Sequence, residues 1–365
     1  MPANMSDKSQ VVYKTAYQES VKSEIEHYTS LYENEQSRKT LTETVPPSWV
    51  FVQERFNALI ANANHGLSFV GEIVEHFKSH PGGCMVSIGS GPGALEMEIA
   101  RHLENQNLEY KIICMDINPN VLALGRERAE SEGLKMSFIE KDINELTLEE
   151  NYYDLIMCHA SLHHLINLEH IYYEMNRSLV SDGKVVVLDI ATRNGYLMWE
   201  ETYKVVQDIW KVLPEKFKYN HTSYSEKRLE ATYENRDYTG DSMECIRSQD
   251  VLPLLNEYFV CQTFVPFTSI SRRFLDTMYG PNYDITQELD RAVMEFIWQL
   301  DNYYISNNIL KPETFFGVYT KGVVGPRPKK ALDLNQRSVR EYVRSQLRRV
   351  INFIKRLAKR VLKIQ

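Results

Sequence analysis

The sequence has few cysteines and no long apolar run, and each shortage excludes a class of protein. Five cysteines occur among 365 residues, an odd number whose spacing fits neither disulfide pairs nor a zinc site. Cys84, Cys114 and Cys158 lie on or beside predicted strands, so we expect small core residues in a reducing compartment. No apolar stretch is long enough to span a bilayer, and the polar residues 1–8 lack the apolar centre of a signal peptide. A cytoplasmic protein that does not cross a membrane is therefore expected.

The charge of the chain is distributed unevenly. Residues 326–365 hold 13 Lys and Arg against Asp333 and Glu341, a net charge of +11. Because the whole chain carries −7, residues 1–325 carry −18, and a body this acidic repels the phosphates of nucleic acid. Nucleic acid is therefore not an expected partner. The length, with 43% hydrophobic residues, predicts one enlarged domain or two closely packed ones.

A glycine-rich turn lies between the apolar residues 85–88 and a helical pattern over residues 95–103. The turn consists of Gly89, Ser90, Gly91, Pro92 and Gly93. Glycine permits unusual backbone dihedrals and removes side chains that would keep a ligand away from the end of a strand. Gly-x-Gly-x-x-Ala from Gly89 suits a dinucleotide, and Gly-x-Gly-x-Gly from the same residue suits S-adenosylmethionine (SAM). The turn alone therefore predicts a nucleotide-type cofactor without choosing between the two.

Polar residues also follow the next three predicted strands. Asp116 ends the strand over residues 111–116, where its carboxylate can accept hydrogen bonds from two ribose hydroxyls. Asp142 follows the strand over residues 136–140 and could accept a hydrogen bond from an adenine amine. The strand over residues 153–158 leads into a loop that contains His159, Ala160, Ser161, Leu162, His163 and His164.

These four motifs, in this order, resemble those of the class I SAM-dependent methyltransferases. The resemblance covers residues 80–192 and implies an α/β fold, with a Rossmann-like seven-stranded sheet and helices on both faces. Residues 258–267 and 315–320 are then expected to be the sixth and seventh strands, the last one antiparallel. The resemblance implies that SAM is bound by Gly89, Ser90, Gly91, Pro92, Gly93, Asp116, Ile117, Asp142, Ile143, His159 and Ala160.

We expect three parts in the chain. Residues 1–78 are expected to form a helical cap, which in this family often closes over the cofactor. Residues 79–325 are expected to be the methyltransferase domain, with an aromatic insertion over residues 193–257 on the acceptor side of the sheet. Core packing of these aromatic side chains is the alternative. Arg272 and Arg273, after the sixth strand, could hold an anionic acceptor group or form a paired couple at the surface.

The third expected part is a basic amphipathic helix over residues 326–365. Apolar residues recur at intervals of three and four from Val339 to Ile364, and Lys and Arg flank this stripe. Such a helix suits an anionic membrane surface, so residues 336–365 are expected to contact one. Packing on the acidic body, pairing with a second subunit and RNA binding stay open as alternatives. The near absence of flanking acids argues against a coiled coil.

Methyl transfer requires the acceptor atom to be aligned with the S–methyl bond and water to be excluded. His163 and His164 are the candidate catalytic bases, because the resemblance places the loop after strand four near the methyl group. Adjacent helical side chains point about 100° apart, so one histidine is expected to face the site and the other to pack. No metal ligands are expected, since no organised carboxylates or thiolates accompany the histidines.

The sequence therefore predicts a SAM-dependent methyltransferase that acts on a small-molecule, glycan or lipid-linked acceptor, with its basic tail as the candidate for peripheral contact with a membrane. Oxygen is the favoured acceptor atom, because no Asn-Pro-Pro-Tyr-like signature of amino-group methylation follows the fourth strand. Nitrogen and carbon stay open. An NAD-dependent oxidoreductase and a non-catalytic scaffold recruited by the tail are the alternatives. The sequence leaves the oligomeric state undetermined.

Overall fold

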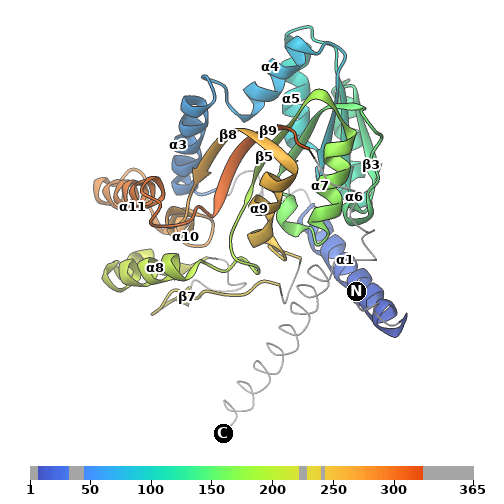
Figure 1. Cartoon of the computed structure of the whole chain (residues 1–365). Coiled ribbons are helices and arrows are strands. Elements are labelled where there is room, and N and C mark those ends of the chain that lie inside the picture. Colours follow the sequence, from blue (N-terminus) through green and yellow to red (C-terminus); the bar gives the residue numbers. More distant parts are fainter. Residues whose placement is uncertain (1–6, 33–44, 222–227, 240–242, 324–365) are drawn as a thin grey trace.

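The computed structural model describes residues 7–32, 45–221, 228–239 and 243–323 (Figure 1). The predicted tail over residues 326–365 lies outside these ranges. Among the described residues, no helix combines the length and the apolar character that crossing a bilayer requires.

The centre of the fold is a sheet of seven strands. These are β1 (Cys84–Ile88), β2 (Lys111–Asp116), β3 (Met136–Glu140), β4 (Tyr153–His159), β5 (Leu179–Ile190), β8 (Phe259–Phe267) and β9 (Thr314–Lys321). Their order is β3-β2-β1-β4-β5-β9-β8, and β9 runs antiparallel to both of its neighbours. This arrangement confirms the predicted Rossmann-like fold, including its sixth and seventh strands.

Side chains alternate between two cores, one on each face of the sheet. Met85 and Leu155 pack into the first core, while their chain neighbours Val86 and Ile156 pack into the second. Because both faces are covered, the central strands are continuous apolar runs. The first face is covered by α4 (Phe69–Ser79), α5 (Ala94–Asn105) and α6 (Pro119–Ser131), and the second by α7 (Leu168–Ser178) and α9 (Ser248–Tyr258).

The strand order creates a natural ligand site. β1 pairs in parallel with β2 on one side and with β4 on the other, so the direction of strand progression reverses at β1. Open α/β sheets bind ligands beyond the carboxyl ends of the strands at such a reversal. At this edge the chain forms short turns, η1 (Ile143–Glu145) and η2 (Leu162–His164).

The helices expected as one N-terminal cap lie in different places. α1 (Asp7–Tyr32) lies beside α6 and reaches the carboxyl edge of the sheet (Figure 1). α3 (Pro47–Ala63) packs on β8, where the rings of Phe56 and Phe267 stack 3.8 Å apart. α4 belongs to the helical layer on the sheet itself. Of these three helices, α1 is therefore the one that covers the carboxyl edge of the sheet.

Added elements surround the sixth and seventh strands. These are α8 (Glu200–Val212), η3 (Glu215–Phe217), β6 (Tyr219–Asn220), β7 (Arg228–Leu229), α10 (Ser271–Leu275), η4 (Gly280–Asn282) and α11 (Glu288–Ser306). Trp210 and Tyr233 of the predicted aromatic insertion are buried against Phe274 and Tyr279. These two insertion residues are therefore core residues. Tyr196 and Tyr238 instead line a cavity.

Candidate cofactor cavity

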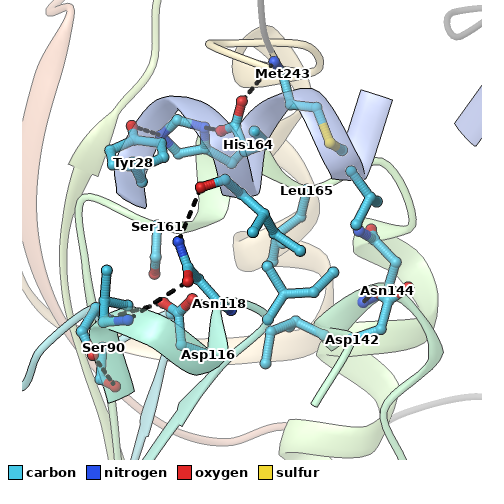
Figure 2. Close-up of a pocket in the computed structure, with 18 of the residues that line it drawn as sticks. Tyr28, Ser90, Asp116, Asn118, Asp142, Asn144, Ser161, His164, Leu165 and Met243 are labelled. Carbon is cyan, nitrogen blue, oxygen red and sulfur yellow. Dashed lines mark hydrogen bonds and ion pairs between the residues drawn. The ribbon is translucent and has the colours of Figure 1, made fainter. Parts of the chain in front are cut away.

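A cavity of about 250 Å³ lies at the carboxyl ends of β1, β2 and β4, between the sheet and α1 (Figure 2). Most of the residues predicted to bind the cofactor line it, namely Gly89, Ser90, Gly91, Pro92, Asp116, Ile117, Asp142, Ile143 and Ala160. Gly93 and His159 lie outside its wall. The side chain of His159 is exposed and meets the edge of the Phe69 ring, with the ring centroids 5.6 Å apart.

The glycines of the turn have different roles. Gly89 has φ of 71°, and a Cβ atom there would come within 2.6 Å of the Cβ atom of Ser161. Gly91 has φ of 54°, and a Cβ atom there would meet no atom within 4 Å. Gly93 precedes α5 and packs closely on Phe138. The turn therefore needs Gly89 for packing, while Gly91 leaves open space beside the cavity.

Asp116 joins the end of β2 to the glycine turn. Its Oδ2 accepts a hydrogen bond from the backbone N–H of Gly91 at 2.8 Å, and its Oδ1 accepts one from the N–H of Asn118 at 2.9 Å. Burial raises the pKa of Asp116 above the usual value. Each carboxylate oxygen can accept a second hydrogen bond, so Asp116 can still receive the hydroxyls of a ribose.

Asp142 is covered by a tyrosine from α1. The Tyr17 hydroxyl lies 2.8 Å from both carboxylate oxygens of Asp142, and the N–H of Asn144 donates to Oδ1 at 2.9 Å. Asn144 also donates to the Tyr17 hydroxyl through its side-chain amide at 3.0 Å. Asp142, which is predicted to accept a hydrogen bond from the adenine amine, thus lines the cavity and already accepts one from the Tyr17 hydroxyl.

A second set of polar contacts holds α1 above the cavity. The Asn118 side chain donates to the backbone carbonyl of Ile25 at 3.2 Å and to the Thr29 hydroxyl at 3.1 Å. Figure 2 shows Tyr28 and His164 at the α1 side of the cavity, opposite Asp116. The cavity residues Asn118, Asn144 and Ser161 were not predicted from the sequence, although each stands within two residues of a predicted site residue. Glu24 and Met243 were not predicted either, and they carry no comparable signal.

His164 is an ion-paired member of the cavity wall. Its Nδ1 lies 2.9 Å from Oε1 of Glu24 on α1, and its Nε2 lies 3.5 Å from Oε2 of Glu244. Burial alone would lower the pKa of His164, but the two carboxylates raise it to about 9. The ring is therefore protonated near neutral pH. A cation accepts no proton, so this geometry favours a positioning role for His164 over that of a base.

His163 packs beneath the cavity instead of lining it. Only 3% of the residue is exposed, and its Nδ1 lies 2.6 Å from Oδ1 of Asp189, which ends β5. Asp189 also accepts hydrogen bonds from the N–H groups of Ser161 and Leu162, so one carboxylate shapes the whole loop. Nε2 of His163 points toward Glu244, 3.6 Å from its Oε1. The two adjacent histidines thus occupy different environments.

One group of metal-ligating side chains occurs among the described residues. Nε2 of His163, a carboxylate oxygen of Glu244 and Sγ of Cys245 lie within 4.8 Å of one another. The Cys245 thiol donates to Glu244 at 3.2 Å, and burial raises its pKa well above the usual value. A protonated thiol is a poor metal ligand, so this arrangement suits a hydrogen-bonded group better than a metal centre.

The cavity has unmet polar capacity that a cofactor could satisfy. Ser161 Oγ is buried in its wall and has no hydrogen-bond partner among the described residues. Native proteins pair most buried polar groups, so such an atom needs an explanation. The hydroxyl of Ser161, the remaining lone pairs of Asp116 and the open space at Gly91 together fit a ligand that carries a ribose and further polar groups.

The two arginines after β8 do not form a surface couple, and that expectation is wrong. Arg273 is buried, and its Nη2 lies 2.5 Å from Oε2 of the buried Glu313. Arg272 is half-buried and lines a separate cavity.

Known proteins match the middle of the chain. Residues 79–256 match the family model of a methyltransferase domain. The chain is 26% identical to the ubiquinone/menaquinone biosynthesis C-methyltransferase UbiE of Blochmanniella pennsylvanica, over 31% of this chain and 44% of that protein. It is 27% identical to the demethylmenaquinone methyltransferase of Bacteroides fragilis, over 31% of this chain and 46% of that protein. The chain thus spans less than half the length of both relatives.

A solved structure of geranyl diphosphate methyltransferase, in complex with GPP and sinefungin, aligns with this chain at a TM-score of 0.40 and 12% identity. The alignment covers 70% of this chain and 77% of that one.

Proposed function

Because residues 79–256 of this chain belong to the class I SAM-dependent methyltransferase family, we propose that the protein transfers the methyl group of SAM to a small-molecule acceptor. The observation that carries this proposal is the Asp116 carboxylate, bound to the Gly91 turn in the wall of the cavity. An NAD-dependent oxidoreductase would share the turn, but the family match favours SAM.

Different residues of the cavity are assigned to different parts of the cofactor. Asp116 receives the ribose hydroxyls. Ile117, Asp142 and Ile143 accommodate the adenine, and the turn from Gly89 to Gly91 faces the methionine part together with Ser161. When bound, SAM supplies the electrophilic methyl group. The protein binds, orients and shields it, with α1 as the cover.

An oxygen acceptor remains the favoured one, because the site contains a carboxylate–imidazole pair suited to taking a proton. Bound SAM would supply the methyl group to the acceptor oxygen, and the acceptor hydroxyl would have to lose its proton. Glu244 lines the second cavity, and Nε2 of His163 lies 3.6 Å from its Oε1, while Nδ1 of His163 lies 2.6 Å from Asp189. We therefore assign proton removal to the Glu244 carboxylate, with the buried His163 and Asp189 positioning it.

Carbon is the second candidate atom, since one relative is named a C-methyltransferase. Loss of a proton from a phenol or an enol makes both its oxygen and a neighbouring carbon nucleophilic. The same pair of residues would therefore serve either outcome. Relatives named for ubiquinone and menaquinone also keep a lipid-linked acceptor within the proposal, and a glycan acceptor stays a prediction.

The cofactor assignment is tested by calorimetric titration with SAM, and with NAD as the competing ligand. We expect saturable binding of SAM, no binding of NAD, and about 100-fold weaker SAM binding by Asp116→Ala, because two hydrogen bonds to a charged acceptor are lost. Glu140→Ala is the matched control, since Glu140 is an exposed acid opposite Asp116 on β3. Binding of NAD in preference to SAM would overturn the proposal.

Membrane contact by residues 336–365 stays a proposal from sequence, because these residues lie outside the described ranges. A stripe of apolar residues with basic flanks supports it. The full chain should sediment with anionic liposomes, and a chain ending at residue 329 should not. Equal sedimentation of the two would remove the support.

A further inference from the structure

A second cavity of about 280 Å³ adjoins the cofactor cavity. It is lined by Trp49, Tyr196, Tyr238, Glu244, Arg272 and Asp276, among others. Oε2 of Glu244 lies 3.5 Å from Nε2 of His164, and His164 lines the cofactor cavity. This ion pair therefore connects the walls of the two cavities.

Arg272 places a positive charge in the wall of this second cavity. Its Nε donates to the Tyr196 hydroxyl at 2.5 Å and its Nη1 to the Thr314 hydroxyl at 3.3 Å. Nη2 has no hydrogen-bond partner in the part of the chain that the structure describes, and no described carboxylate lies within ion-pair distance of the guanidinium. Withdrawing a charge from water without a counter-charge is unfavourable. Asp276 in the same cavity acts on the guanidinium at longer range, but no described carboxylate contacts it, so Nη2 is left to bind an anion from elsewhere.

Two other buried arginines show the usual arrangement. Arg273 pairs with Glu313 at 2.5 Å. Arg247 pairs with Glu169 at 2.8 Å and with Asp250 at 3.0 Å. The fold thus places carboxylates in contact with arginines that serve its core, whereas no carboxylate of the described residues contacts Arg272, which faces a cavity.

The backbone of Tyr196, the hydrogen-bond partner of Arg272, is strained. Tyr196 has φ of 61°, in the left-handed region that bulky residues rarely adopt. Its ring lies beneath both arginines, with the guanidinium carbon of Arg273 at 4.5 Å and that of Arg272 at 5.4 Å from the ring centroid. Backbone strain of this kind persists where the surrounding structure imposes it, and it concentrates at functional sites. Here the strained residue holds Arg272 at the cavity wall.

Two carboxylates share the cavity, and each has compensation of its own. Glu244 lies 3.6 Å from His163 and 3.5 Å from His164, and although burial opposes the effect, these rings hold its pKa below the usual value. Asp276 accepts a hydrogen bond from the N–H of Met278 at 2.9 Å; burial raises its pKa, against the opposing effect of the Arg272 guanidinium. Arg272 thus interacts with Asp276 only at longer range, and its Nη2 stays open to a ligand in direct contact.

We propose that the second cavity receives the methyl acceptor, and that Arg272 binds a carboxylate group carried by that acceptor. The planar guanidinium presents parallel N–H groups that match a carboxylate. The rings of Trp49 and Tyr238 favour a compact molecule with a flat apolar face. The acceptor would lie beside the Glu244–His163 pair. This inference rests on the proposed methyl transfer, because it assigns the second substrate of that reaction.

The test uses matched pairs of small acids and their uncharged amides, namely benzoate with benzamide and 4-hydroxybenzoate with 4-hydroxybenzamide. Each is titrated into the full-length protein saturated with S-adenosylhomocysteine, and the shift in melting temperature and the affinity are recorded. We expect the acids to bind and the amides to bind at least about tenfold more weakly. Arg272→Gln should abolish this preference, Arg272→Lys should retain part of it, and the control Arg55→Gln should leave it intact.

The outcomes separate this inference from the proposed function. If S-adenosylhomocysteine does not bind the unmodified protein, the methyltransferase proposal itself fails. If it binds normally but no acid is preferred over its amide, or if Arg272→Gln keeps the preference, the carboxylate assignment is wrong. If Arg272→Gln weakens S-adenosylhomocysteine and the acids by the same factor, Arg272 serves the carboxylate of the cofactor, and this too overturns the inference.

Discussion

The floor and the cover of the cofactor cavity are stabilised by different kinds of interaction. The floor is the ends of β1, β2 and β4, whose side chains behind the cavity are buried in the two apolar cores. The cover is α1, which is held by polar contacts, namely Tyr17 with Asp142, Glu24 with His164, and Asn118 with Ile25 and Thr29. A small apolar cluster of Tyr17 and Val21 with Ile166, Met243 and Ile246 adds to them. Apolar burial is insensitive to pH, whereas an ion pair is not.

This difference suggests a division of labour. A rigid floor fixes the cofactor in position, as transfer to an aligned acceptor requires. A cover held by a few polar contacts and one small apolar cluster can open at modest cost, because such segments come from the less stable part of a structure. Cofactor entry would then require α1 to move while the sheet stays unchanged.

The largest expected effect is on the floor. Gly89→Ala should lower the free energy of unfolding by about 3 kcal/mol, because the added Cβ meets Ser161 and the backbone has positive φ. Gly91→Ala should cost only about 1 kcal/mol, the strain of its φ, since its Cβ meets no protein atom. Urea unfolding measures both changes.

The pair of glycine variants also separates packing from binding. Gly91→Ala should bind SAM at least about tenfold more weakly in calorimetry, although it stays folded, because the methyl group occupies cofactor space. Normal SAM affinity in Gly91→Ala would mean that the open space at this residue belongs to no ligand, and the floor would lose its assigned function.

The same contrast explains what sequence could predict. Gly89, Gly91 and Asp116 stand at strand ends, where a local pattern reveals both the turn and the cavity edge. The cover depends on contacts between distant residues, such as Tyr17 with Asp142 at a separation of 125 positions, and no local pattern encodes them. The resemblance implied a cap, but it named none of these contacts.

The position of His159 outside the cavity wall has a physical cause of its own. β4 ends at His159, and the next residue, Ala160, has φ of 50°. This left-handed residue turns the chain, so that Ala160 and Ser161 line the cavity and the His159 side chain lies outside it. An alanine at positive φ gives no signal in a single sequence, because this conformation is typical of glycine.

A smaller effect is expected on the cover, and it depends on pH. The pKa of His164 is about 9 in the folded protein, above the roughly 6.5 of an unfolded chain. The stability from its ion pairs should therefore be complete below about pH 6.5 and should be lost as pH rises through 9. We expect a loss of about 2 kcal/mol, after allowance for partial exposure of the ring.

The measurement is the difference in unfolding free energy between the unmodified protein and His164→Gln at each pH. The difference should shrink with rising pH, and proteolysis of α1 should become faster, because Glu24 lies on that helix. His102→Gln, an exposed histidine at the end of α5, serves as the control. A difference that stays constant from pH 6 to pH 10 would show that the cover is not held by this charge.

The smallest effect is expected from Tyr17→Phe, which removes one hydroxyl from the cover. Unfolding free energy should fall by about 1 kcal/mol, because Asp142 and Asn144 lose a hydrogen-bond partner while the ring stays buried. SAM affinity should change less than about threefold, since Asp142 still lines the cavity. Tyr152→Phe is the control, because Tyr152 directly precedes β4, at the end of the strand opposite the cavity. A tenfold gain in SAM affinity would instead mean that the Tyr17 hydroxyl competes with the adenine amine for Asp142, and α1 would then act as a barrier to the cofactor instead of a cover over it.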